Sequence, residues 1–351
     1  MSAQHRYLFA ALVLLLCGAC SVVPSAVTTP GTANPSLSTG ASDVLAALGT
    51  PGRCYVGAFV DDSTVMGDTA NISSVLDLQQ FETLAAKGVA ISQMYQAFCM
   101  GTTELGFPTD NANAARSYGA VPMLTLEPWD LAATGNSLLN AIVAGSYDGT
   151  LASFANGLKA YGDPVLLRFG HEMNGNWYPW SGAANNQSAA RYVEAYRYVH
   201  SYMASAGVSN VLWVFCPNAE SVPSATWNEA QDYYPGDSYV DIVGVDGYNF
   251  GGGAERTFTQ TFAAFHSIYQ AQWSIKPLVI AELGASELAA DKPSWISDAY
   301  AQLQSTFTDV RAVMWFHNDD GPATDFRINS DAAAQSAFRA AVSPVYFLSR
   351  F

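Results

Sequence analysis

The chain has 351 residues, half of them hydrophobic, which is enough for a sizeable core in one large α/β domain or two smaller domains. Its formal net charge is −15, although charged residues make up only 13% of the chain, and it contains eight Trp. Because an acidic surface repels phosphate groups, this balance argues against nucleic acid or an anionic membrane as a partner and indicates a neutral ligand.

The first 20 residues are typical of a secretory signal peptide. His5 and Arg6 precede an apolar stretch over residues 7–16, which is too short to span a membrane. Residues 18–20 also resemble a bacterial lipoprotein cleavage box with Cys20 as the lipidated residue, although Cys17 stands where Leu is usual. We therefore expect a protein that is secreted, periplasmic or held at a bacterial cell surface, with a lipid anchor at Cys20 and ordinary cleavage near residues 19–26 as open alternatives.

Residues 21–50 are rich in Ser, Thr, Pro, Ala and Gly and carry a single charge, at Asp43. This composition predicts a flexible linker, followed by one folded domain over residues 51–351. Outside the signal the chain keeps three cysteines, Cys54, Cys99 and Cys216, an odd number that does not suit a disulfide scaffold. Cys54 and Cys99 fall at opposite ends of neighbouring predicted strands, so we expect them not to pair.

Short apolar runs alternate with amphipathic segments along this domain. Apolar residues at spacings of three predict a helix after Asn71, and further helices are predicted over residues 109–117, 148–161, 187–206, 257–272, 293–306 and 331–341. Strands are predicted over residues 55–60, 89–97, 121–126, 165–169, 211–215, 240–245, 278–281 and 310–315. Eight strands alternating with helices predict an α/β fold of the (β/α)8 TIM-barrel class. A doubly wound open sheet is the alternative, weakened because no Gly-rich phosphate loop follows the first strand.

Polar and aromatic residues gather where the predicted strands end. In a (β/α)8 barrel the reacting groups lie at the C-terminal ends of the strands. These ends carry Glu127 and Trp129 (third strand), His171, Glu172 and Asn174 (fourth), Asn218 (fifth), Asp246 and Tyr248 (sixth), Glu282 (seventh) and Trp315 (eighth). Such a set exceeds what a stable but inert barrel requires.

Two of these residues, Glu172 and Glu282, follow their strands directly, and strands four and seven lie across the barrel mouth from one another. Retaining glycosidases use two carboxyl groups about 5–5.5 Å apart, one as nucleophile and one as acid/base. We expect Glu172, with His171 and Trp177 around it, to be the acid with a raised pKa, and Glu282 to be the nucleophile.

Two neighbouring side chains are expected to support this pair. Tyr248 is placed to hydrogen-bond Glu282. Arg168 stands inside the fourth strand, where a charge needs a buried partner, and either an ion pair within the barrel or a contact to Glu282 satisfies it.

Three segments, over residues 171–180, 234–249 and 276–284, resemble glycoside hydrolase family 26, whose members are mostly β-mannanases. The resemblance covers most of residues 52–345, and the His171-Glu172 pair is its most specific feature. It implies that Glu172 is the acid/base and Glu282 the nucleophile, that His171 and Tyr248 support them, and that Trp315 is a platform for stacking a sugar.

The chain departs from the family pattern in Glu282-Leu-Gly, where Phe usually follows the Glu. Glu127-Pro-Trp129 resembles the pattern of outlying members, some of which cut other β-glycans. Both features concern the substrate rather than the chemistry. We expect a retaining endo-β-glycanase, first an endo-β-1,4-mannanase. The alternatives are a mixed-linkage β-glucanase, a β-1,3-xylanase, or a weakly catalytic polysaccharide-binding lipoprotein.

The remaining strand-end residues are expected to contact a neutral β-linked polysaccharide. They are the aromatic residues Trp129, Trp177 and Trp180, with Glu127, Asn174 and Asn218 as polar contacts. The five histidines show no ligand spacing, so we expect neither a metal nor another cofactor. We further expect a monomer.

Overall fold

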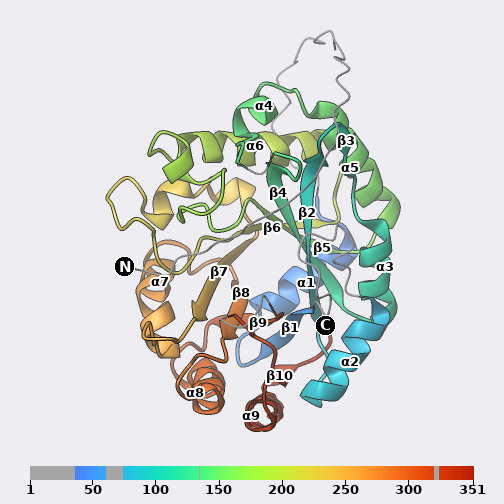
Figure 1. Ribbon diagram of the computed structural model, residues 1–351. Coiled ribbons are helices and arrows are strands. Elements are labelled where there is room, and N and C mark those ends of the chain that lie inside the picture. Colours follow the sequence, from blue (N-terminus) through green and yellow to red (C-terminus); the bar gives the residue numbers. More distant parts are fainter. Residues whose placement is uncertain (1–35, 61–73, 134, 320–323) are drawn as a thin grey trace.

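The computed structural model describes residues 36–60, 74–133, 135–319 and 324–351. Eight parallel strands form a closed barrel, in which β1 pairs with both β2 and β9 (Figure 1). The predicted barrel is therefore confirmed. Its strands are β1 (Cys54–Val60), β2 (Ile91–Met100), β4 (Val121–Asp130), β5 (Val165–Phe169), β6 (Val211–Phe215), β7 (Ile242–Asn249), β8 (Leu278–Ala285) and β9 (Val310–His317).

The helices surround the barrel (Figure 1). Each predicted helix is present, with ends within a few residues of those expected: α2 (Val75–Ala85), α3 (Thr109–Tyr118), α5 (Asp148–Tyr161), α6 (Ala190–Ser205), α7 (Phe258–Gln272), α8 (Lys292–Ser305) and α9 (Ala332–Val342). Among the described residues, the α-helices and strands that were not predicted are α1 (Thr39–Gly49), β3 (Thr103–Glu104), α4 (Leu139–Val143) and β10 (Phe347–Leu348).

Side chains alternate along each strand between the barrel interior and the helix layer, as the period of two requires. On β4 and β5, Met123 and Leu166 belong to the core cluster inside the barrel, whereas Leu124 and Leu167 belong to the cluster that packs under the helices. Residues that continue the inward series toward the strand ends line the barrel mouth. This alternation decides which strand-end side chains belong to the site.

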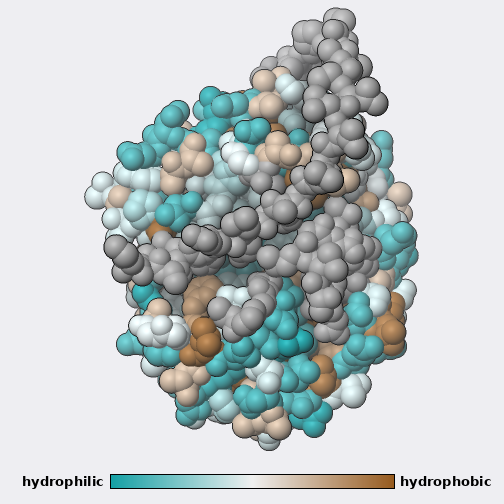
Figure 2. Space-filling view, in the orientation of Figure 1, coloured by the Kyte–Doolittle hydropathy of each residue, from teal (hydrophilic) through white to brown (hydrophobic). Residues whose placement is uncertain are grey.

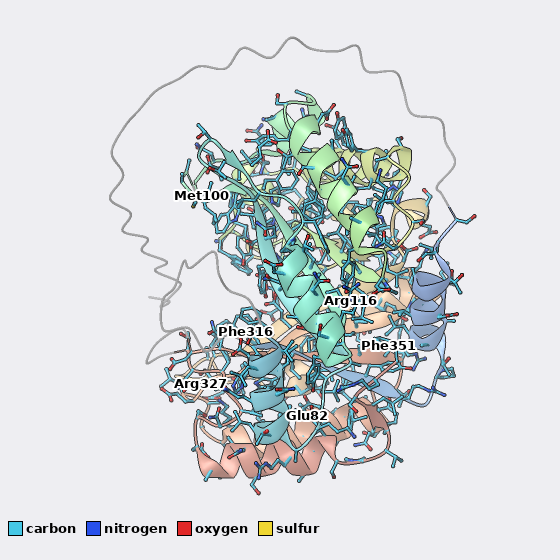
Figure 3. The ribbon with its side chains drawn as sticks, turned by 90° about the vertical axis from the view of Figure 1, so that its right-hand side faces the viewer. Glu82, Met100, Arg116, Phe316, Arg327 and Phe351 are labelled. Carbon is cyan, nitrogen blue, oxygen red and sulfur yellow. The ribbon has the colours of Figure 1, made fainter. Side chains whose placement is uncertain are left out.

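Helix α1 closes the barrel at the end opposite the mouth. Ala41, Val44 and Leu48 are buried in the same cluster as the inward residues of the strands, and the backbone N–H of Ser38 donates to Ser209 O at 2.7 Å, just before β6. Met100 and Phe316 lie near the C-terminal ends of β2 and β9, and in Figure 3 the blue α1 is on the opposite side of the molecule from both.

The predicted linker over residues 21–50 is therefore wrong for residues 39–49. Average composition hid three apolar side chains at spacings of three and four, which form one face of a helix.

Cys54, Cys99 and Cys216 are buried free thiols, as expected. The predicted signal peptide over residues 1–20 and its Cys20 lie outside the described residues. Among the helices that are described, none is both long and apolar enough to cross a membrane. Hydrophilic residues cover much of the coloured face in Figure 2, and hydrophobic ones are scattered among them.

Helix α1 should contribute measurably to stability. Leu48→Ala removes a fully buried side chain from the barrel floor and should lower the free energy of unfolding by about 2–5 kcal/mol. Ala46→Ser on the exposed face of the same helix is the control and should cost about 0.5 kcal/mol or less. Denaturant titration measures both; equal stabilities for the two variants would show that α1 is not part of the folded domain.

Candidate active site

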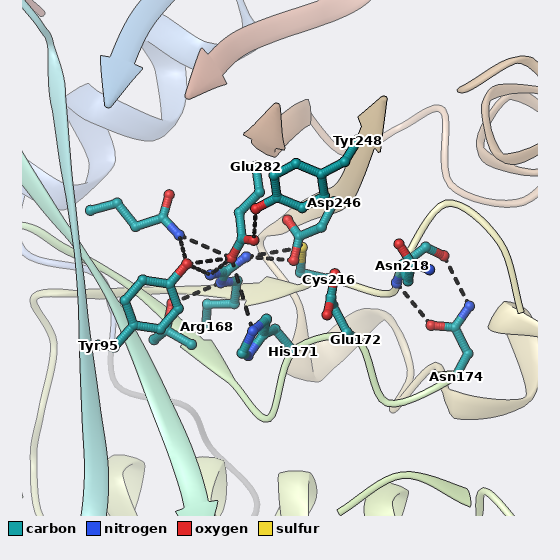
Figure 4. A network of polar contacts seen from close by, with 12 residues as sticks. Tyr95, Arg168, His171, Glu172, Asn174, Cys216, Asn218, Asp246, Tyr248 and Glu282 are labelled. Atoms are coloured by element: carbon teal, nitrogen blue, oxygen red, sulfur yellow. Dashed lines mark hydrogen bonds and ion pairs between the residues drawn. The ribbon is translucent and has the colours of Figure 1, made fainter. Parts of the chain in front are cut away.

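Arg168 lies at the centre of a buried polar network inside the barrel mouth (Figure 4). It continues the inward series of β5, two residues after Leu166. Its Nη1 donates to Asp246 Oδ2 at 2.7 Å and its Nη2 to Glu282 Oε1 at 2.5 Å, while Nε donates to Thr125 Oγ1 at 2.9 Å. Both possibilities left open by the sequence are thus realised, because Arg168 forms an ion pair within the barrel and also contacts Glu282.

A β-bulge turns Glu282 into this network. Val245 on β7 pairs with Ile280 on β8, but the next residue, Asp246, pairs with Glu282, so Ala281 is an extra residue on β8. Regular alternation from the inward Ala281 would have sent Glu282 under the helices. The extra residue resets the alternation and directs the carboxylate into the mouth.

Glu282 is held by hydrogen-bond donors on both of its oxygens. Tyr95 donates to Oε1 at 2.5 Å and Gln93 at 3.2 Å, and Tyr248 donates to Oε2, which confirms the expected contact between Tyr248 and Glu282. Burial favours the neutral acid, but the Arg168 charge, with smaller contributions that include the hydrogen bonds from Tyr248 and Tyr95, outweighs it and lowers the pKa of Glu282 below its ordinary value. Glu282 is therefore ionised at neutral pH.

Glu172 has the opposite protonation state. It is buried, and this burial, together with the nearby Glu282 charge, raises its pKa to about 8. Trp177 Nε1 donates to Glu172 Oε2 at 2.7 Å and lowers the pKa by a smaller amount. The Glu172 backbone is left-handed, with φ of 53°, and its N–H donates to Cys216 O at 2.9 Å. A non-glycine residue in this region is strained, and such strain concentrates at functional sites.

His171 is buried between these two acids and the aromatic residues of the loop. Burial, followed by the Arg168 charge, lowers its pKa to about 3, so the imidazole is neutral. Its Nε2 is 3.9 Å from Glu282 Oε1, too far for a hydrogen bond, and its ring packs on Tyr178 at 4.8 Å.

The potential ligand atoms of His171, Asp246 and Glu282 lie within 4.8 Å of one another, as they would in a metal site. The guanidinium of Arg168 already donates to both carboxylates. These three residues therefore fit an ion-pair network better than a cation cage.

The sequence profile of glycosyl hydrolase family 26 matches residues 134–315, just over half of the chain. The chain belongs to glycosyl hydrolase family 26. Endoglucanase H of Acetivibrio thermocellus is 34% identical over 253 residues, which make up 70% of this chain and 27% of that protein. A mannan endo-1,4-beta-mannosidase of Bacillus subtilis is 37% identical over 145 residues, which make up 39% of this chain and 36% of that protein. This family 26 chain thus spans about a quarter to a third of the length of these relatives.

Solved structures share the fold of this family 26 chain. The catalytic domain of a Bacillus endo-beta-1,4-mannanase superposes with a TM-score of 0.66 at 20% identity, covering 90% of this chain and 92% of that one. An endo-beta-1,4-mannanase of Cellulomonas fimi superposes with a TM-score of 0.63 at 18% identity, covering 90% and 76%.

Two of the tryptophans predicted to contact sugar do not reach the mouth. Trp180 is fully buried, donates from Nε1 to His171 O at 2.7 Å and stacks on Tyr178 at 4.2 Å. The prediction for Trp180 is wrong, because this indole packs under the loop that carries the acid. Trp177 and Trp129 are half-buried at the mouth and remain candidates for sugar contacts.

Trp315 is likewise fully buried, and its prediction as a sugar platform is wrong. On β9 the inward series is Ala312, Met314 and then Phe316, so Trp315 points into the helix layer, where its Nε1 donates to Phe326 O at 2.7 Å. Phe316 (labelled in Figure 3) is the half-buried aromatic residue at the mouth. Its ring centroid is 4.9 Å from that of Phe59. The prediction failed because Trp315 is one residue out of phase with the inward-facing side chains of β9.

Asn174 joins two loops instead of contacting a sugar. It is buried; its Oδ1 accepts from Asn218 N at 2.8 Å and its Nδ2 donates to Asn218 O at 2.9 Å. The predicted polar contact from Asn174 is wrong, because both ends of its amide are used within the protein. Asn218 is half-buried and remains a candidate for a polar contact to the sugar.

Glu127 is a third carboxyl group near the nucleophile. It ends the inward series of β4 and is 8% exposed. Burial raises the pKa of Glu127 to about 8. The Arg168 charge opposes this shift and the Glu282 charge adds to it. At neutral pH Glu127 is therefore a protonated group that can donate a hydrogen bond to a ligand hydroxyl.

Sequence reasoning missed Gln93 and Tyr95, the two β2 residues that contact Glu282. A signal was present, since Ile91, Gln93 and Tyr95 share one face of this strand, and two side chains with polar groups on the inward face indicate a buried polar partner.

Proposed function

We propose that this family 26 chain is a retaining endo-β-glycanase, with Glu282 as nucleophile and Glu172 as acid/base. The observation that carries this proposal is the opposite protonation of two carboxyl groups in one buried network. Arg168 lowers the pKa of Glu282, whereas burial raises that of Glu172 to about 8. A nucleophile must be ionised and an acid protonated at the same pH, and this pair meets both requirements.

The reaction would proceed by double displacement. The Glu282 carboxylate attacks the anomeric carbon while Glu172 gives its proton to the departing glycosidic oxygen, which leaves a glycosyl ester on Glu282. Water then attacks the same carbon and gives a proton to the Glu172 carboxylate, and the ester bond breaks to restore Glu282. These steps use only side chains and water.

For the substrate we propose a neutral β-linked polysaccharide, first a β-1,4-mannan, as the name of the Bacillus subtilis relative suggests. A β-glucan is the second candidate, because the Acetivibrio thermocellus relative matches over 253 residues and is named an endoglucanase. Glu127 and Trp129, which depart from the pattern of most family members, stand where they could distinguish the two.

We also propose that the chain acts outside the cytoplasm as a monomer, either secreted or held by a lipid on Cys20. Support comes from the signal-like residues 1–20. The position of α1 agrees with this, because a tether leading into it would attach at the end of the barrel opposite the mouth and leave the site open to polymer.

Hydrolysis of a polysaccharide panel tests the activity and the substrate together. With mannan, lichenan and β-1,3-xylan, release of mixed oligosaccharides from mannan is expected, and Glu282→Ala should reduce it by at least 10⁴-fold, on the order of the loss found for other catalytic nucleophiles. Release from lichenan alone would favour the β-glucanase. Binding without hydrolysis on all three polymers would instead indicate a polysaccharide-binding protein.

The pH dependence of kcat/KM tests the assignment of the acid. Because the active form has Glu282 ionised and Glu172 protonated, activity should fall below the pKa of Glu282, on the acid side, and again above about pH 8. Trp177→Phe removes a donor that favours the Glu172 carboxylate, so the alkaline limb should move up by about one unit.

Trp227→Phe, whose indole lines a groove together with residues of α6, is the matched control and should leave both limbs in place. An alkaline limb that stays unchanged in Trp177→Phe would assign that limb to a group other than Glu172.

A further inference from the structure

The two carboxylate oxygens of Glu282 have unequal surroundings (Figure 4). Oε1 accepts hydrogen bonds from Arg168 Nη2 at 2.5 Å, from the Tyr95 hydroxyl at 2.5 Å and from Gln93 Nε2 at 3.2 Å. Oε2 accepts one hydrogen bond from the described residues, and its donor is the Tyr248 hydroxyl. A carboxylate oxygen offers about two lone-pair sites, so Oε1 is saturated and Oε2 is not.

Gln93 and Tyr95 act together. Gln93 Nε2 donates to the Tyr95 hydroxyl at 2.8 Å, and Arg168 Nη2 is a second donor to it at 3.4 Å. With its oxygen accepting from both neighbours, the hydroxyl has its one hydrogen left to donate, and Glu282 Oε1 receives it. Burial and the Glu282 charge raise the pKa of Tyr95 well above its ordinary value, so the phenol keeps that hydrogen at working pH.

We propose that Gln93 and Tyr95 are positioning residues that reserve Oε1 of Glu282 for the protein and leave Oε2 as the atom that attacks the sugar. This inference rests on the proposed function, since it assigns parts to two further residues in the same double displacement. It concerns β2, which supplies neither the acid nor the nucleophile.

The assignment has different consequences for the two chemical steps. In the first step Oε2 bonds to the anomeric carbon, and Oε1 becomes the carbonyl oxygen of the ester. In the second step water attacks that carbon, the bond from carbon to Oε2 breaks, and its electron pair returns to the carboxylate. Because the donors on Oε1 stabilise the returning charge, losing one of them should slow the second step more than the first.

Tyr95→Phe is the direct test, because it removes the donor and keeps the ring that packs 5.0 Å from Phe59. With dinitrophenyl β-mannobioside and β-cellobioside, whose good leaving groups make the second step limiting, kcat should fall by about tenfold or more. KM should fall with it, so that kcat/KM stays within about threefold. The pKa of Glu282, followed by carbon-13 NMR of labelled glutamate, should rise because a donor to the ionised form is lost.

Gln93→Met should shift both readouts in the same direction by less, since its own bond to Glu282 is longer. Tyr198→Phe is the matched control, because it removes a phenol–carboxylate bond of 2.7 Å to Asp148 in the outer helix layer, and it should change neither readout.

An unchanged Glu282 pKa in Tyr95→Phe, or equal losses in kcat and kcat/KM, would overturn the inference. If the wild-type chain hydrolysed none of the substrates while the NMR shift appeared, the proposed function would fail and the assignment of Tyr95 as the donor to Glu282 would stand.

Discussion

The site depends on the buried charge of Arg168. Its guanidinium has no exposure to solvent, and Asp246, Glu282 and Thr125 each accept one of its hydrogen bonds. Removing one partner of such a buried pair usually costs about 3–5 kcal/mol, because the other charge is left uncompensated. The same charge decides protonation nearby. It lowers the pKa of Glu282, which it contacts directly, whereas burial prevails at Glu172 and Glu127.

The barrel makes this arrangement possible through its alternation and through one departure from it. Apolar side chains fill the interior toward α1, and the polar side chains of the inward series begin above them, with Gln93 on β2, Thr125 on β4 and Arg168 on β5. At β8 the extra residue Ala281 brings Glu282 into that layer. At the end of β5 the left-handed backbone of Glu172 performs the corresponding task for the acid. Both catalytic candidates thus owe their direction to local irregularities on a regular frame.

Much of this could be predicted from the sequence. The strands and the seven larger helices around the barrel follow from apolar runs and spacings, and the two glutamates stand out because each follows a strand directly. What failed was side-chain direction. Trp315 and Trp180 lie close to the mouth in sequence but point into packed layers, and the amide of Asn174 is used between two loops.

The missed features have a common physical cause. The hydrogen bonds of Gln93 and Tyr95 to Glu282 span almost 190 positions in sequence, so no local pattern names their partner. Helix α1 was hidden because its buried face consists of three side chains in an otherwise linker-like segment.

In the proposed reaction Glu282, ionised by Arg168, forms a covalent bond to the sugar while Glu172 supplies the proton. The most direct measurement is mass spectrometry of peptides after incubation with an activated 2-deoxy-2-fluoro glycoside, which slows the second step and traps the ester. We expect one added sugar, on the peptide that contains Glu282, and none in Glu282→Gln. A label on Glu172 or Glu127, or turnover of this reagent with inverted anomeric configuration, would contradict the proposed reaction.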